Sequence, residues 1–366
     1  MPQPVVTGSF SVLFLFEVAE EIRLEELRRI VGTHPSGREP ALRHTAPGYV
    51  QFAIPPVVEP LREPVLPSAE GWTGRVAYYE YGVASLRLER PFEGGWDDVA
   101  QLSARWMDTP ELEQRAADAV RRHLQRAATT LVKPYAEFLT EDYFIIHVSS
   151  VVTTDGHIAT GDELIERCAE PIAQIVRGER ATFSAAERKE ILESRMSYYE
   201  TDLLVVGWSA ALIYDTPAGA APTIQLLEYA NTQLLEFRHY DAVLTALLSR
   251  VYRSLEKGTG VLGRWRLARE AEHLNTIRLD VRELTERVDN SIKFLSDTFA
   301  ARLYRMAASR IGVPDYRNLV EQKLQSAGDL YASMMDRFYQ GRAFILELMV
   351  VVILVIELVY FFRGVR

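Results

Sequence analysis

The first 222 residues carry two hydrophobic patterns, one typical of strands and one typical of helices. Polar and apolar residues alternate over 9–18, and an amphipathic helical period follows over 20–31. The same patterns predict further strands over 49–54 and 143–152, and a long strand or a hairpin over 75–88 (bent near Gly82) and over 203–214. They predict further helices over 96–130, 162–177 and 184–196. The order β-α-β-β-α-β predicts an α+β fold with a ferredoxin-like mixed sheet.

From residue 223 the pattern is helical, with long helices predicted over 223–257, over 264–310 and from 315 onward. Apolar residues step in threes and fours along the second and third of these helices, which is typical of a coiled coil. They are Leu274, Ile277, Val281, Leu284 and Val288, then Val320, Leu324, Ala327, Tyr331, Met334 and Phe338. We expect an antiparallel coiled-coil hairpin that turns at 312–314, with ordinary bundle helices packed on the α/β part as the alternative.

A third kind of pattern occupies residues 343–362, where twenty residues contain only two charges, Glu347 and Glu357. As a helix this run covers ~30 Å, the thickness of a bilayer core. It predicts one C-terminal transmembrane helix, with a buried core helix as the alternative. The expected organisation is a soluble α/β domain over 1–222, a long-helix and coiled-coil region over 223–341, and the transmembrane helix over 343–362.

The ends of the chain predict its topology. Residues 1–17 contain no Lys or Arg, so they do not match a signal peptide. Only four residues follow the predicted span, which is typical of a tail anchor. We therefore expect localisation at a bacterial or organelle inner membrane, with the bulk of the chain on the cytosolic, reducing side.

Composition adds two exclusions. The 366 residues include 41 basic and 50 acidic side chains, a formal charge of −9, which argues against a general nucleic-acid binder and so against a DNA partner. The single cysteine, Cys168, excludes an intramolecular disulfide and suits a reducing compartment.

The C-terminal residues resemble a known membrane family. Leu346-Glu347 opens the run 348–356, and Glu357 closes it; the tract 317–335 precedes this run, and Tyr79–Val83 reads YEYGV. In these features the chain resembles the "required for meiotic nuclear division" / YagE-type family, relatives of the sporulation protein RMD. The resemblance is strongest over the C-terminal third. It implies a membrane-anchored protein that supports translation at an inner membrane, and it implies no active site.

Glu347 and Glu357 are candidates for an intramembrane interface. A carboxylate within a bilayer costs roughly 2.5–3.5 kcal/mol or more, so such acids usually face a partner. Their spacing of ten residues places them ~80° apart around a helix. Partial snorkelling towards the headgroups and proton or ion translocation are the alternatives.

Two Glu-x-x-His pairs, Glu236–His239 and Glu270–His273, are candidates for metal ligands. The i, i+3 spacing places both members of a pair on one helix face, as in di-iron bundles. In an acidic chain with seven histidines, such pairs also arise by chance, and solvated helix faces are the alternative.

A small basic and aromatic patch, Arg264, Trp265, Arg266 and Arg269, is a candidate for contact with an anionic partner such as RNA or lipid headgroups. The alternative is a hinge with a buried tryptophan. The neighbouring sequence Gly258–Gly263 spells GxGxxG but follows a predicted helix, so it also indicates a hinge.

These observations favour a scaffold or tether that presents a cytosolic α/β domain and self-associates. The expected partners are a lipid bilayer, other copies of the chain and an unidentified protein. Two alternatives stay open: a membrane-bound di-metal carboxylate enzyme, and a ribosome- or RNA-associated membrane factor. The chain has no serine nucleophile elbow and no P-loop, so the sequence predicts no catalytic residue and no cofactor.

Overall fold

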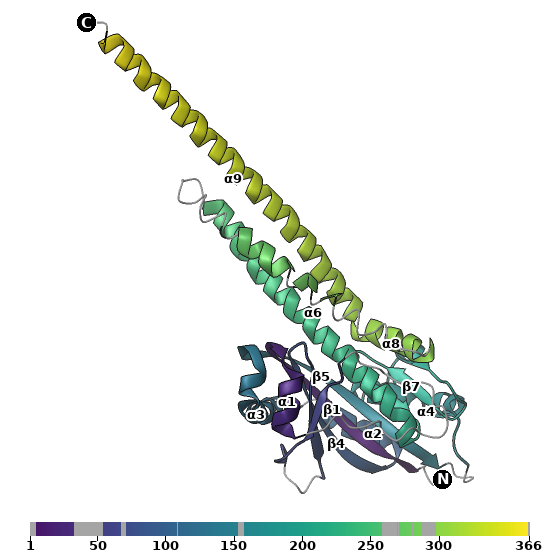
Figure 1. Cartoon of the computed structure of the whole chain (residues 1–366). Helices are drawn as coiled ribbons and strands as arrows, with labels where there is room; N and C mark the ends of the chain where they lie inside the picture. The colour runs from purple at the N-terminus through teal and green to yellow at the C-terminus, as the bar shows by residue number, and fades with distance from the viewer. Residues whose placement is uncertain are drawn as a thin grey trace. The chain divides into compact units, whose positions relative to one another are not determined.

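The computed structural model describes residues 5–32, 54–66, 71–107, 109–152, 157–257, 269, 271–279, 281–283, 285–286 and 298–364 (Figure 1). The chain forms two compact units: Met1–His239 with Val288–Tyr316, and Tyr240–Arg287 with Arg317–Arg366. The chain therefore leaves the first unit, returns to it once and leaves again. The boundaries at 222 and 341 divide the chain into sequential segments and stay a prediction.

The first unit is built on an eight-stranded sheet in the order β2-β3-β4-β1-β5-β8-β7-β6. The strands are β1 (Val5–Ile22), β2 (Val57–Pro60), β3 (Thr73–Tyr78), β4 (Val83–Gly94), β5 (Leu131–Val152), β6 (Arg195–Met196), β7 (Leu203–Val206) and β8 (Ala210–Tyr214). The central strand β1 pairs antiparallel with both β4 and β5. Among the described strands, the one parallel pair is β5 with β8.

Helices cover both faces of this sheet. They are α1 (Leu24–Val31), α2 (Trp96–Met107), α3 (Pro110–Arg126), α4 (Gly161–Arg177), α5 (Ala185–Glu193), the first part of α6 (Pro217–Lys257) and α8 (Thr298–Ile311), with a short 3₁₀ turn η2 (Ala128–Thr130). Local signals set several ends. Thr160 and Glu163 form a capping box at the start of α4, and the Ser184 hydroxyl accepts a hydrogen bond from the Glu187 N–H at 3.2 Å at the start of α5.

One face of the sheet is apolar. The even-numbered residues Phe10, Phe14 and Phe16 of β1 belong to one core cluster with side chains of α1 to α5. Val12 pairs with Leu88 of β4 and with Phe144 of β5, and all three lie in that cluster. Strand pairing therefore brings apolar side chains of three neighbouring strands to the same side.

The opposite face carries a buried polar layer between the sheet and α6. On the sheet side it contains the buried Ser11, Glu17 and Ser85 and the half-buried Ser9 and Arg87, all odd-numbered. On α6 it contains the buried Glu228, Asn231, Thr232, Gln233 and Glu236. Two contacts join the sheet side to α6: an ion pair of Arg75 with Glu228 at 3.2 Å and a hydrogen bond between the Tyr81 and Thr232 hydroxyls at 2.8 Å. The layer therefore joins α6 to the sheet by directional contacts rather than by apolar packing alone.

Helix α8 also belongs to the first unit. Its Phe299 ring lies 4.8 Å from the ring of Tyr198, and its Arg310 pairs with Glu190 of α5 at 2.8 Å. The Tyr304 hydroxyl donates a hydrogen bond to Gln233 of α6. Helix α8, which follows residues 240–287 of the second unit, thus contacts both α5 of the first unit and the polar layer.

The second unit consists of helices packed side by side. In α9 (Val313–Arg363), Ala327 packs with Leu274 and with Leu247 and Leu248 of α6, and Met334 packs with Ala271 and Val251. Lys323 pairs with Asp241 at 2.5 Å. The predicted seam residues Leu274, Ile277, Ala327 and Tyr331 therefore share one cluster, which α6 joins as an additional helix. Leu284 and Val288 lie outside the described residues.

The ferredoxin-like sheet is a wrong prediction. The strand order and the long antiparallel pairing of β1 with β5 give an eight-stranded mixed sheet instead. The physical reason is the length of these two strands, 18 and 22 residues, whose pairing ladder runs from Val5↔Val152 to Ile22↔Leu131. The hairpin bent at Gly82 is confirmed as β3–β4.

The transmembrane prediction also needs correction. Within the part of the chain that the structure describes, no helix combines the length and the apolar character needed to cross a membrane. The charges give a physical reason: only nine consecutive apolar residues, 348–356, separate Glu347 from Glu357, and they cover ~14 Å of a ~30 Å core. The span over 343–362, the tail anchor and the inner-membrane localisation are therefore withdrawn.

Gly82 provides a test of the β3–β4 turn. Its φ is +93°, and a Cβ there would collide with the backbone carbonyl of Ala19. We expect Gly82→Ala to lower the unfolding free energy by about 3 kcal/mol or more, measured by urea denaturation. The control is Gly32→Ala, since Gly32 also has a positive φ, +72°, but open space around it, so we expect a loss of about 1 kcal/mol. Equal losses would contradict the steric argument.

Candidate functional site

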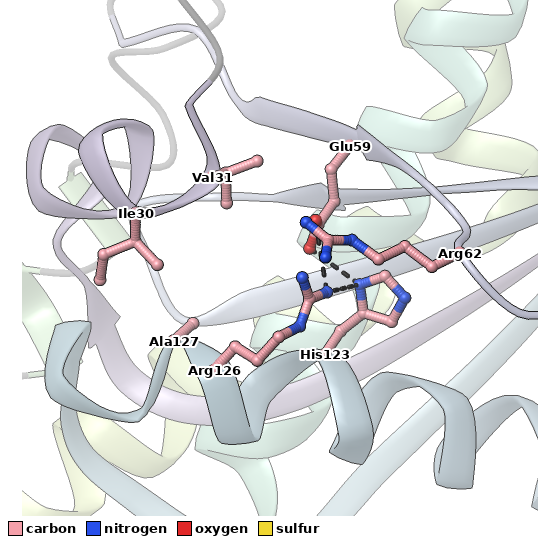
Figure 2. A pocket seen from close by; sticks show the side chains of 7 residues that line it. All are labelled: Ile30, Val31, Glu59, Arg62, His123, Arg126 and Ala127. Carbon is pink, nitrogen blue, oxygen red and sulfur yellow. Dashed lines mark hydrogen bonds and ion pairs between the residues drawn. The ribbon is translucent and has the colours of Figure 1, made fainter.

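A pocket in the first unit is the candidate site. It is lined by Ile30, Val31, Glu59, Arg62, His123, Arg126 and Ala127, and we call it the Glu59 pocket (Figure 2). The cavity measures about 210 Å³. Its residues come from the end of α1, from β2 with the loop after it, and from the end of α3.

Local sequence explains why these elements end here. Helix α1 stops at Gly32, whose left-handed φ of +72° closes the helix with a hydrogen bond to Arg28. Strand β2 ends at Pro60 and pairs with β3, and an edge position is where a strand tolerates proline. Val57 and Glu59 alternate inward, whereas Val58 is exposed. The alternation therefore directs a carboxylate into the interior.

The Glu59 carboxylate is buried and is the centre of a hydrogen-bond network. It accepts a hydrogen bond from the Tyr78 hydroxyl at 2.7 Å. Its Oε1 lies 2.8 Å from Nδ1 of His123, and its Oε2 lies 3.4 Å from Nη2 of Arg126. Three donors from β3 and α3 thus converge on one side chain, and they compensate for its removal from water.

The protonation of His123 follows from its neighbours. Its Nδ1 lies 2.8 Å from the Glu59 carboxylate and 2.9 Å from the Arg126 guanidinium. A guanidinium has no acceptor, whereas a carboxylate is a strong one. We therefore assign a proton to Nδ1, donated to Glu59, which fixes the orientation of the imidazole ring.

The network also determines the charge of Glu59. Burial on its own raises the pKa of Glu59, but hydrogen bonds from His123 and Tyr78, with the charges of His123 and Arg126, lower that pKa below its ordinary value. Burial, together with the hydrogen bond to Glu59 and its charge, raises the pKa of Tyr78. Near neutral pH, Glu59 is therefore an anion and Tyr78 is a protonated donor.

The remaining lining residues give the pocket a mixed character. Arg62 is exposed, and within the described ranges it makes no hydrogen bond or ion pair. Ile30, Val31 and Ala127 form an apolar wall. Figure 2 shows Arg62 and Arg126 extending into the pocket from a loop and from a helix. Chemically, the arrangement presents cationic hydrogen-bond donors beside an aliphatic surface.

Sequence reasoning missed this pocket. Glu59 lies in a proline-rich stretch that predicts only an extended connection, and His123 and Arg126 lie on a helix with many charged residues. The one available signal is the i, i+3 spacing of His123 and Arg126, which places both on one helix face.

Glu236, a predicted metal ligand, has a different neighbour from the one expected. It is fully buried in the polar layer and shares a hydrogen bond with Glu17 of β1, which is also buried. Burial first, then the charge and the hydrogen bond of Glu236, raise the pKa of Glu17 well above its ordinary value. Burial beside a second carboxyl group therefore favours the protonated form of Glu17.

The other predicted metal ligands are not brought together by any described contact. The His239 ring lies 4.9 Å from the ring of Tyr135, and burial lowers the pKa of His239. His273 is exposed, and Glu270 lies outside the described residues. Over the residues that the structure describes, no three or more His, Cys, Asp or Glu side chains are grouped to hold a metal. The four-residue metal site and its enzyme stay a prediction.

The remaining candidates lie in the second unit or outside the described residues. Arg264, Trp265 and Arg266 lie outside them, and Arg269 is exposed, so the anionic-partner patch and the RNA-associated alternative stay predictions. Glu347 and Glu357 are exposed on α9. Their intramembrane role depended on the withdrawn span and is withdrawn with it.

Comparison with known proteins places the match in the first unit. The model of the family "Uncharacterized protein MJ0711, N-terminal domain" matches residues 7–221. The uncharacterized protein MJ0711 of Methanocaldococcus jannaschii is 21% identical over 199 residues, which are 54% of this chain and 61% of the relative. The match thus spans less than two thirds of the relative's length. No solved structure matches the chain.

These findings overturn the resemblance to the RMD/YagE-type family. That resemblance was strongest over the C-terminal third, with Tyr79–Val83 as its one feature nearer the N-terminus, whereas the matched family covers residues 7–221. A pattern of aliphatic residues between two glutamates is set by helix composition, so it distinguishes families poorly. Support of translation at a membrane, which only the resemblance implied, is withdrawn.

The Glu59 network predicts a pH-dependent stability. Because the pKa of Glu59 is lowered in the folded chain, its contribution is present above the unfolded value of about 4.3 and is lost as the pH falls through the folded value. We expect Glu59→Gln to cost about 2 kcal/mol of unfolding free energy at pH 7 and less at pH 3.5. Urea denaturation at both pH values measures this difference, with Glu63→Gln as the exposed control. A loss of the same size at both pH values would refute the network's charge assignment.

The Glu17–Glu236 pair predicts the opposite trend. A carboxyl group whose pKa is raised in the folded chain stabilises it below the unfolded pKa, and this contribution disappears as the pH rises towards the folded value. We expect Glu17→Gln to be stabilising at pH 8 relative to wild type, with little effect at pH 4. The gain at pH 8 is about 1.4 kcal/mol for each unit, counted up to pH 8, by which the folded pKa of Glu17 exceeds its unfolded pKa.

Thermal or urea unfolding across this pH range checks the trend. Glu20→Gln, on the same strand but partly exposed, is the control. The raised pKa of Glu17 is ruled out if Glu17→Gln leaves the slope of stability against pH unchanged.

Proposed function

We propose an assembly role for this chain, which belongs to the family of the N-terminal domain of uncharacterized protein MJ0711. In that role the chain is a scaffold. In this proposal the family's α/β unit is displayed by long helices, and the end of α9 joins copies of the chain. The observation that supports it is the apolar surface of α9 between Leu348 and Phe361.

That surface consists of aliphatic and aromatic side chains that are 48% to 68% exposed. They are Leu348, Met349, Val350, Val351, Val352, Ile353, Leu354, Val355, Ile356, Leu358, Val359 and Phe361. Contiguous apolar patches of this kind mark interaction surfaces, since single exposed apolar residues are common but continuous runs are not. Burying one such side chain contributes about 1.5–3 kcal/mol.

The proposed occupant of this surface is the same segment of other copies. Leu348, Val352, Val355 and Val359 step in fours and threes, the spacing that lets identical helices interlock. Every copy carries the same seam, so a symmetric contact is self-complementary. Because apolar residues continue around the helix, a dimer would leave much of the surface exposed, and we expect more than two copies.

The test is the mass of the full chain in solution, by size-exclusion chromatography with light scattering. We expect the wild type to be a multiple of the one-chain mass. Val355→Lys with Val359→Lys should shift it to one copy, or raise the dissociation constant by at least about tenfold, because two charges would be buried in the seam.

A matched control uses the same helix and the same spacing. Gln322→Lys with Ser326→Lys adds two charges at exposed positions of α9 outside the apolar end, and it should leave the mass unchanged. Circular dichroism verifies that both variants keep their helices. A one-copy mass for the wild type at tens of micromolar protein would reject the scaffold, as would equal behaviour of the two variants.

A further inference from the structure

We propose that the Glu59 pocket binds a small aliphatic carboxylate, whose carboxylate group pairs with Arg62 and Arg126 while its short chain lies against Ile30, Val31 and Ala127. This inference goes beyond the scaffold proposal. It concerns the first unit only, and its readout does not depend on the number of copies.

The charges of the lining residues favour an anion. Glu59 is the one acidic residue of the lining, and its oxygens already accept from Tyr78, His123 and Arg126. Arg62 adds a second guanidinium, for which the described part of the chain supplies no partner. The pocket therefore carries surplus positive charge in a chain whose formal charge is −9. A local field of opposite sign to the whole protein concentrates anions at that site.

The donors also fit a carboxylate geometrically. A guanidinium presents planar pairs of N–H groups that match the two oxygens of a carboxylate. Arg126 directs Nη2 towards the Glu59 carboxylate at 3.4 Å, and its other N–H groups are not used in that network. Glu59 thus acts as a positioning residue: it holds Arg126 and His123 in place through the carboxylate at the centre of the network.

Size and lining distinguish a carboxylate from other anions. The cavity of about 210 Å³ is below the usual 300–1,000 Å³ of drug-sized sites, so a nucleotide is too large. Inorganic phosphate would leave the apolar wall of Ile30, Val31 and Ala127 without a contact. A doubly charged phosphate would also be repelled by the ionised Glu59 carboxylate. A monoanion with a short hydrocarbon chain uses both halves of the pocket.

The experiment is isothermal titration of the full chain with sodium butyrate, and with inorganic phosphate and 1-butanol at matched ionic strength. We expect saturable binding of butyrate with a dissociation constant of about 1 mM or below, which corresponds to roughly −4 kcal/mol. Phosphate and butanol should bind at least about tenfold more weakly, because each lacks one half of the recognition.

Two variants locate the site. Arg62→Gln should weaken butyrate binding by about tenfold or more, and since Arg62 is exposed the fold should be retained. The matched control is Arg122→Gln: Arg122 lies on α3, as Arg126 does, pairs with Glu63 at 3.4 Å and does not line the pocket, so binding should change less than about twofold. Amide chemical shifts that move at Ile30, Val31 and Ala127 on titration would support the placement.

Three results would overturn the proposal. They are no saturable butyrate binding up to about 50 mM, phosphate binding tighter than butyrate, and equal butyrate affinity in the wild type and Arg62→Gln. None of these results bears on the mass of the chain in solution, so a failure here is separate from a failure of the scaffold.

Discussion

The antiparallel pairing of β1 with β4 and β5 is the constraint on which the first unit depends. Because side chains alternate along a strand, this register assigns Phe10, Phe14 and Phe16 to the apolar core and Ser9, Ser11 and Glu17 to the polar layer beneath α6. A slip of one residue would exchange these two sets, burying Glu17 among the helices α1 to α5. Two incompatible faces thus specify a single register, and the same register brings Glu17 to Glu236.

The sequence predicted much of the local structure and little of the long-range pairing. The turn at Gly82, the start of α4 and the hairpin of β7 and β8 depend on residues close together in sequence, so their patterns are visible there. The pairing of β1 with β5 joins residues more than 100 positions apart, and hydrophobic alternation cannot say which strand lies beside which. The ferredoxin-like prediction was wrong at this step. The C-terminal run was misassigned as a membrane span because its apolar content was given more weight than the two acidic residues that divide it.

Both buried acidic groups show why sites are harder to predict than elements. Glu59 lies among prolines, where sequence indicates only a connection, yet the alternation of side chains along β2 directs it to Tyr78, His123 and Arg126. Glu236 was noticed for its spacing to His239, but its partner is Glu17, which is 219 positions earlier on a strand. In each case the partners lie on distant strands or helices, and the packing that brings them together could not be derived from one sequence. The sequence shows the residue types, but it does not show which of these side chains lie in contact.

The chain leaves the first unit after His239 and returns to it at Val288, and this order has a consequence for biosynthesis. The polar face of the sheet is covered by α6, and α8 contacts Gln233 of that helix, yet α8 is synthesised only after the chain has passed through the first half of the second unit. A nascent chain that ends near residue 221, where the family match stops, would expose Arg75, Arg87 and Glu17 without Glu228 or Glu236 opposite them. Folding of the first unit therefore cannot be complete when its last strand has been synthesised, because α6 and α8 come later in the chain. The contact of α8 with α6 is therefore made late, by a segment that returns to the first unit only after residues 240–287 have been synthesised.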